Sequence, residues 1–265
     1  MEYVISHDGT RIAYARSGVG PPLVLIHGTG IEHSYWDPVA SDLGRHFTVY
    51  RVDRRGRGQS GDTAPYAIQR EFEDVAAIIE SIAGDVFLVG HSYGALCSLE
   101  AALLTTNISK VILNEPPMYT TVEVTLPADV PAALLACVEA GEWEKVLVLL
   151  YEVGGMSDAE LHWLKSLPSW RARIQAAPTM LREILSVREY AFDPVRFKDL
   201  KMPVLLLVGG ETDSVYTAAT EALHASLPNS RLAVLPGQPH DAALTVPEIF
   251  VQQVLRFLQE NGPAI

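Results

Sequence analysis

The chain lacks the marks of membrane and secreted proteins. No uncharged apolar run reaches the roughly 18 residues that suggest a membrane-spanning helix. The N-terminus has no basic segment followed by an apolar stretch, as a secretion signal would. Two cysteines are too few for a disulfide framework. We therefore expect a cytoplasmic protein without a membrane partner.

The chain is also poor in positive charge. It has 20 Lys and Arg residues against 32 Asp and Glu, a formal net charge of −12. Nucleic-acid binding needs clustered cations that displace counterions from phosphates. Only Arg51–Arg57 (RVDRRGR) is locally basic, and a solvated or hydrogen-bonded loop explains it more simply than an anion site. We expect no nucleic-acid partner.

The overall composition is that of a folded protein. Hydrophobic residues make up 48% of the 265 residues, charged residues make up 20%, and the mean hydropathy is +0.15. Disorder requires low hydrophobicity together with high net charge, so long disordered tracts are not expected. The length suits one compact domain with an insertion.

Short apolar runs alternate with segments of helical spacing, which predicts an α/β fold with a mostly parallel sheet. Their near-continuous hydrophobicity indicates that helices cover both faces of the sheet. The predicted parallel strands are Leu23–His27, Phe47–Val52, Val86–Gly90, Val111–Asn114, Val204–Val208 and Leu232–Leu235.

Elements near both ends of the chain complete this prediction. Tyr3–Ile5 and Ile12–Ala15 flank Asp8-Gly9, a pair that fits a tight hairpin, so we expect an antiparallel edge. Asp74–Ile82 and Pro247–Leu258 carry apolar residues at helical spacing.

The alternation lapses between the fourth and fifth parallel strands. Residues 116–200 resemble short helices broken by prolines, which predicts a helical lid inserted into a core of residues 1–115 and 201–265. This segment holds Trp143, Trp163 and Trp170. Such residues more often fill a small helical core than line a pocket.

The strongest local motif is Gly90-His91-Ser92-Tyr93-Gly94, which ends one predicted strand and opens a helical run. A nucleophile on this turn has a strained backbone, and glycines two residues away on either side remove collisions. The turn also brings the amides of the helix start close to developing negative charge. Ser92 is therefore the predicted nucleophile.

A serine hydroxyl needs a base to become reactive. His240 lies just past the last predicted strand and before the final helix. The carboxyl ends of parallel strands are where an open α/β sheet gathers its site, so His240 is the predicted base. His7, His46, His162 and His224 have no such placement.

A carboxylate should orient the base. Asp213 follows the strand Val204–Val208, and the order Ser, Asp, His suits this type of fold, so Asp213 is the predicted acid. Glu115, after the strand Val111–Asn114, is the alternative. Asp241 is too near His240 in sequence to orient it easily.

The oxyanion hole is expected from the backbone amides of Thr29 and Tyr93. Thr29 stands in a His-Gly-Thr-Gly loop after the first parallel strand. Losing one such donor typically costs about 10² to 10³ in turnover. His27 is interpreted as structural, because a zinc site with His33 or Asp37 would lack a ligand motif.

These motifs, with DRRGRGQSG from Asp53 to Gly61, occur in the order seen in the α/β-hydrolase superfamily. The chain resembles its small capped esterases and lactonases over essentially its whole length. The resemblance implies an eight-stranded sheet with the lid after the sixth strand, acyl transfer through Ser92, and no cofactor or metal. The chain departs from many relatives at Pro239 and at Val215-Tyr216. An aspartate nucleophile, as in dehalogenase and epoxide-hydrolase branches, is absent.

The expected function is hydrolysis of a carboxylic ester or lactone of a small to medium, partly apolar substrate. The same triad could serve a carbon–carbon bond hydrolase, a perhydrolase or haloperoxidase, or a lyase. A non-catalytic ligand receptor is the alternative from another class. The only expected partner is a small-molecule substrate. The sequence leaves the oligomeric state open, with a homodimer as one option.

Overall fold

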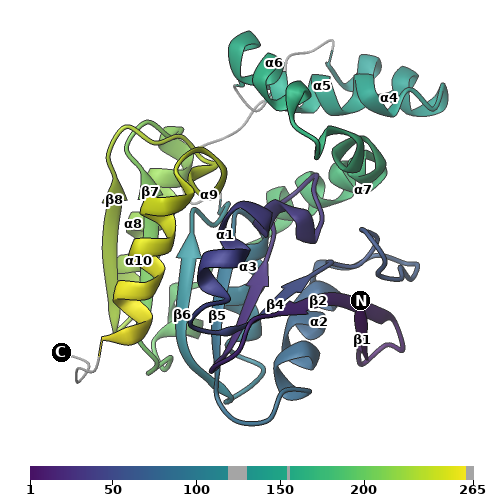
Figure 1. Cartoon of the computed structure of the whole chain (residues 1–265). Coiled ribbons are helices and arrows are strands. Elements are labelled where there is room, and N and C mark those ends of the chain that lie inside the picture. Colours follow the sequence, from purple (N-terminus) through teal and green to yellow (C-terminus); the bar gives the residue numbers. More distant parts are fainter. Residues whose placement is uncertain (119–129, 154–155, 261–265) are drawn as a thin grey trace.

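The structure, a computed structural model, describes residues 1–118, 130–153 and 156–260. Its centre is an eight-stranded sheet with the order β1-β2-β4-β3-β5-β6-β7-β8 (Figure 1). β2 is antiparallel to both β1 and β4, and the other neighbours are parallel, which confirms the predicted α/β class. The strands are β1 Glu2–Ile5, β2 Arg11–Ser17, β3 Pro22–Ile26, β4 Thr48–Val52, β5 Val86–His91, β6 Ile108–Asn114, β7 Val204–Gly209 and β8 Ser230–Leu235.

The predicted hairpin forms the antiparallel edge. The Ser6 amide donates to the Thr10 carbonyl at 2.8 Å, and the Gly9 amide donates to the Ser6 carbonyl at 2.9 Å. Gly9 has a φ of 84°, a conformation that a side chain would disfavour. The Asp-Gly pair therefore turns the chain where the sequence indicated.

Helices cover both faces of the sheet, as predicted. Alternate residues of β3 point to opposite faces, because side chains in a strand alternate. Leu23 and Leu25 pack in one buried cluster with α1 and α10, whereas Val24 and Ile26 pack in another with α2, α3 and α8. The helices are α1 Asp37–Leu43, α2 Ile68–Glu80, α3 Tyr93–Ala101, α8 Ser214–Ser226, α9 Ala242–Thr245 and α10 Pro247–Gln259, with a short 3-10 turn His33–Trp36 before α1.

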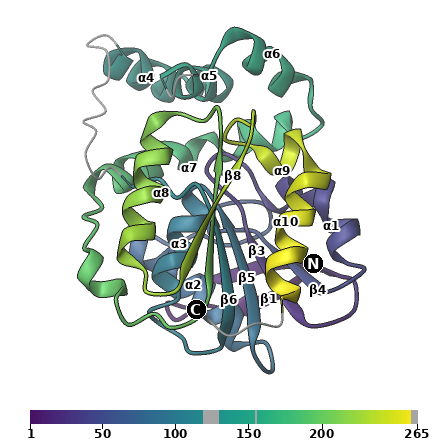
Figure 2. The same ribbon diagram turned by 90° about the vertical axis from the view of Figure 1, so that its left-hand side faces the viewer.

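Within the described residues between β6 and β7, the chain forms four further helices, which we call the helical insertion. They are α4 Val130–Glu139, α5 Trp143–Val153, α6 Asp158–Ser166 and α7 Trp170–Glu189, and a 3-10 turn, Pro194–Phe197, follows them. Figures 1 and 2 show α4, α5 and α6 beyond the carboxyl end of the sheet. The insertion has its own apolar cluster, which includes Val146, Leu147 and Met180. The division of the chain at residues 116 and 200 stays a prediction, and two parts of that segment, 119–129 and 154–155, lie outside the described residues.

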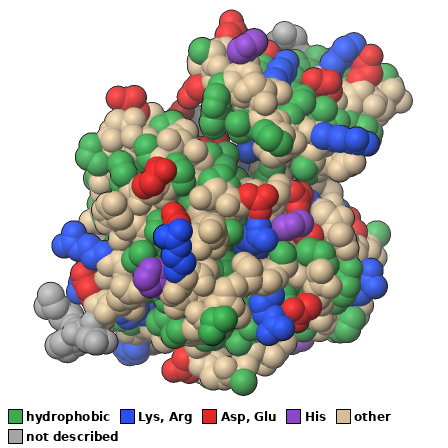
Figure 3. Space-filling view, viewed as in Figure 1, with side chains coloured by type: hydrophobic (Ala, Val, Ile, Leu, Met, Phe, Trp, Pro, Cys, Tyr) green, Lys and Arg blue, Asp and Glu red, His purple; other side chains and the backbone are tan. Residues whose placement is uncertain are grey.

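The visible surface mixes charges of both signs. Figure 3 shows acidic and basic side chains interspersed on one face of the molecule, which is hollowed between the insertion and the body beneath it. Among the described helices, none combines the length and apolarity that a bilayer crossing requires.

Candidate active site

Ser92 occupies the turn between β5 and α3. Its φ of 53° and ψ of −126° form a sparsely populated conformation that surrounding contacts must hold in place. The Ser92 amide donates to the Asn114 carbonyl of β6 at 2.8 Å, and the Ser92 carbonyl accepts from the Ala95 amide at 2.8 Å. The predicted strand–nucleophile–helix turn is therefore present.

Close packing explains the glycines on either side of Ser92. A Cβ on Gly90 would lie 2.5 Å from the Gly94 carbonyl oxygen, and a Cβ on Gly94 would lie 2.3 Å from the Ile26 carbonyl oxygen. A third glycine, Gly28 in the loop after β3, would place a Cβ 2.9 Å from the Ser92 Cβ. Any side chain at these positions would displace the turn or crowd the hydroxyl.

His240 is held by Glu115. Its Nδ1 forms a short hydrogen bond and ion pair with Glu115 Oε2. The Glu115 carboxylate is fully buried and also accepts from the Gly209 amide at 2.5 Å and from the Thr212 hydroxyl at 2.8 Å. With Nδ1–H directed at the carboxylate, Nε2 is left as the nitrogen that can accept a proton.

The prediction that Asp213 orients the histidine is not supported by this geometry. Asp213 Oδ1 accepts from the Val215 amide at 2.9 Å, so the side chain caps the N-terminus of α8. Asp213 is exposed, and it lines the same cavity as His240. A sequence motif cannot separate an aspartate that caps a helix from one that orients a histidine, because both follow a strand and precede a helix. The partner of His240 is Glu115, the alternative that the sequence offered.

Sheet register accounts for the position of Glu115. β5 and β6 are parallel neighbours, and His91 pairs with Asn114. Glu115 therefore follows the end of β6 just as Ser92 follows the end of β5, and the two residues lie at the same edge of the sheet. A φ of 51° at Glu115 turns the chain there. The sequence signal for Glu115 was a carboxylate directly after a buried strand. Knowing that this strand lies next to the strand of the nucleophile would have favoured Glu115 over Asp213.

The surroundings of His240 raise its pKa. Burial disfavours the protonated ring, but the hydrogen bond and charge of Glu115, with a smaller contribution from Asp241, raise the pKa above its ordinary value. The Tyr216 ring stacks on His240 with centroids 4.1 Å apart and planes at 21°. These contacts fix the orientation of the imidazole and favour the imidazolium that would form during proton transfer.

A second histidine, His91, contacts His240 but stays neutral. Burial, aided by repulsion from His240, lowers the pKa of His91 to about 3. Its Nε2 donates to the His240 carbonyl at 3.1 Å, which fixes the tautomer. A neutral His91 supports the loop that carries His240 without competing for its proton.

Ser92 and His240 line one cavity of about 880 Å³ between the sheet and the insertion. Thr29 and Tyr93, the predicted oxyanion donors, line it as well. Trp163 also lines it, whereas Trp143 and Trp170 pack against the apolar cluster of the insertion. One of the three tryptophans therefore reaches the pocket.

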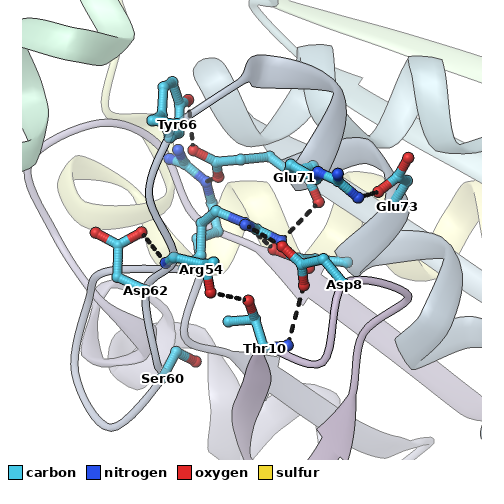
Figure 4. A network of polar contacts seen from close by, with 12 residues as sticks. Asp8, Thr10, Arg54, Ser60, Asp62, Tyr66, Glu71 and Glu73 are labelled. Atoms are coloured by element: carbon cyan, nitrogen blue, oxygen red, sulfur yellow. Dashed lines mark hydrogen bonds and ion pairs between the residues drawn. The ribbon is translucent and has the colours of Figure 1, made fainter.

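The basic loop after β4 is a buried ionic network. Arg54 Nε donates to Glu71 at 2.8 Å, and Arg54 also pairs with Glu183 of α7. Figure 4 shows Tyr66 and Arg54 converging on Glu71. Arg57 contacts Glu183 at 2.5 Å. The interpretation of this loop as hydrogen-bonded is confirmed, and its arginines fasten the insertion to the core.

One group of side chains has the composition of a metal site. Ligand atoms of Glu32, His33 and Asp53 lie within 4.8 Å of one another. His33 already bonds Asp53 at 2.7 Å and pairs with Glu32, and the two carboxylates raise its pKa to about 10. The three side chains form a hydrogen-bonded cluster of one histidine and two carboxylates. His27, interpreted as structural, is fully buried and accepts from the Arg54 amide at 3.2 Å.

Comparison with known proteins shows the family of the chain. The model of the α/β-hydrolase family matches residues 23–253, and the chain belongs to that family. A solved α/β hydrolase from Sphaerobacter thermophilus DSM 20745 is 33% identical, with a TM-score of 0.85 over 97% of this chain and 100% of the other. The esterase RhEst1 from Rhodococcus sp. ECU1013 is 25% identical, with a TM-score of 0.79 over 98% and 99% of the two chains.

A curated relative from Agrobacterium fabrum (strain C58 / ATCC 33970) bears the name "Putative carbamate hydrolase RutD". It is 27% identical over 243 residues, which cover 90% of this chain and 93% of the relative. The chain is thus a member of the α/β-hydrolase class of proteins.

Proposed function

We propose that the chain is a serine hydrolase that cleaves a carboxylic ester or lactone through an acyl-enzyme, with Ser92 as nucleophile, His240 as base and Glu115 as orienting acid. The observation that carries the proposal is the bond between His240 and a buried carboxylate beside a strained serine. An inert alcohol becomes nucleophilic when a neighbouring imidazole can take its proton.

The proposed reaction has two halves. The Ser92 hydroxyl attacks the acyl carbon and gives its proton to His240 Nε2, and His240 returns it to the leaving alkoxide. Water then attacks the acyl-enzyme by the same route. The Thr29 and Tyr93 amides are the proposed donors to the oxyanion in both tetrahedral intermediates.

A carbamate is the second candidate substrate class. The observation that favours it is the name of the relatives that are 27% identical over nine-tenths of this chain. A carbamate presents the same kind of acyl carbon, so no residue role changes. Comparing short esters, lactones and carbamates as substrates would rank these classes.

Ser92→Ala tests the proposal. Because the nucleophile is removed, we expect turnover of a short p-nitrophenyl ester to fall by about 10⁶-fold. A fluorophosphonate probe should label the wild type and leave Ser92→Ala unlabelled. Ser41→Ala, at an exposed position of α1, serves as the matched control and should behave as wild type. Wild-type protein that resists the probe yet binds small ligands would instead indicate a receptor.

A further inference from the structure

The helical insertion places two arginines of α7 against the cavity, Arg188, which is exposed, and Arg173, which is buried. Arg173 of α7 lines the cavity with a residue exposure of only 3%. Its Nη1 donates to the Tyr151 hydroxyl at 2.8 Å. Nε and Nη2 are buried and have no hydrogen-bond partner among the described residues. Buried polar groups are nearly always paired, so two free donors on one side chain require an explanation.

No carboxylate of a described residue forms an ion pair with Arg173. The charge of Asp241 attracts Arg173, but the ion pair of the Asp241 carboxylate is with His91 Nε2, at 3.8 Å. Burial disfavours the charge of Arg173, yet Tyr151 and Asp241 outweigh it and raise the pKa of the guanidinium. Arg173 is therefore a buried cation in the wall of the cavity, without a partner of opposite charge in contact within the described part of the chain.

The two unpartnered donors share one edge of the guanidinium. Nε–H and the Nη2–H on the same side point in parallel, and this fork matches the two oxygens of a carboxylate. Nη1, on the other edge, is held by Tyr151 of α5, which fixes the plane of the group. The fork is thus held in position before any ligand enters.

We propose that Arg173 binds a carboxylate of the substrate, so that the preferred substrates are acyl compounds with a free carboxylate, such as monoesters of dicarboxylic acids. The inference rests on the proposed function, because it assigns a substrate class to the same site. The remaining walls supply apolar contacts for the spacer between the two ends, from residues that include Ile31, Leu134, Leu150 and Ile184.

Binding is tested first, without turnover. Succinate, glutarate and adipate are titrated by calorimetry into Ser92→Ala protein, with and without Arg173→Met. At least one diacid should bind, and Arg173→Met should weaken its affinity by about 10²-fold, because charged hydrogen bonds are lost in a buried site. Arg171→Met, an exposed arginine of the same helix, should leave the affinity unchanged.

Kinetics with the wild-type nucleophile form the second arm. Monomethyl glutarate is compared with methyl pentanoate, and monomethyl adipate with methyl hexanoate, so that only the carboxylate differs. We expect kcat/KM to favour the acid esters by at least about 10-fold, and Arg173→Met to remove this preference while changing the neutral esters less than about 3-fold. Arg173→Lys, which keeps the charge without the fork, should lie between.

The outcomes separate the two proposals. Diacids that fail to bind, with esters hydrolysed without preference, would overturn the carboxylate site and leave the hydrolase standing, with water as the partner of Arg173. Arg173-dependent binding without turnover of any ester would support the carboxylate site and refute the ester hydrolase. If Arg173→Met slows neutral and acid esters alike, the residue serves the fold, which Arg173→Lys would confirm by restoring both.

Discussion

The two walls of the cavity hold their polar groups in different ways. At the sheet, Ser92 and Glu115 both have positive φ, and backbone hydrogen bonds to neighbouring strands fix them. In the insertion, Arg173 projects from a helix, and its side chain has a single hydrogen-bond partner among the described residues. Under the two proposals made above, the sheet side positions the reacting groups, and the helical side binds the carboxylate of the substrate.

Replacing the carboxylate of Glu115 on the sheet side should have the largest effect on activity. Glu115→Gln removes the charge that orients and supports His240, and kcat/KM for a neutral ester should fall by about 10² to 10⁴-fold. Asp213→Asn is the matched control, since asparagine caps a helix as well as aspartate does. It should keep activity within about 3-fold. A large loss in Asp213→Asn with little loss in Glu115→Gln would reinstate Asp213 as the acid.

The attachment of the insertion should matter next, and to stability. Glu183 of α7 is fully buried against Arg54 and Arg57. Glu183→Gln leaves a buried cation uncompensated, and removing one partner of a buried pair typically costs about 3–5 kcal/mol. Urea unfolding should show this loss, whereas Glu189→Gln, exposed on the same helix, should change stability by less than about 0.5 kcal/mol. Equal effects of the two variants would show that the ionic network does not fasten the insertion.

The smallest expected effect is a shift in the pH profile. The pKa of His240 is raised, and only the neutral ring can act as base, so kcat/KM should fall on acidification with a midpoint above about 6.5. Glu115→Gln should move the midpoint down, because the carboxylate that favours protonation is gone. Arg173→Met should leave it unchanged for a neutral ester. A wild-type midpoint below the ordinary histidine value would contradict the pairing with Glu115.

Sequence patterns predicted the polar groups at the end of the sheet better than those of the helical insertion. Ser92 and His240 stand in turns whose local chemistry is readable, and the structure brings both to one cavity. Glu115 was placed second because strand order is a tertiary property. Arg173 carries no local signal, since a lone arginine in a helical run is usually solvated.

The sequence by itself determined the alternation of buried strands and helices and the glycine-flanked serine turn, because short-range sterics and hydrophobic periodicity set these features. Only the tertiary structure decided that Glu115 rather than Asp213 meets His240, since β6 pairs with the strand of the nucleophile. It also decided that Arg173 is buried against the cavity, because the fold of the insertion over the sheet determines which side chains lose water.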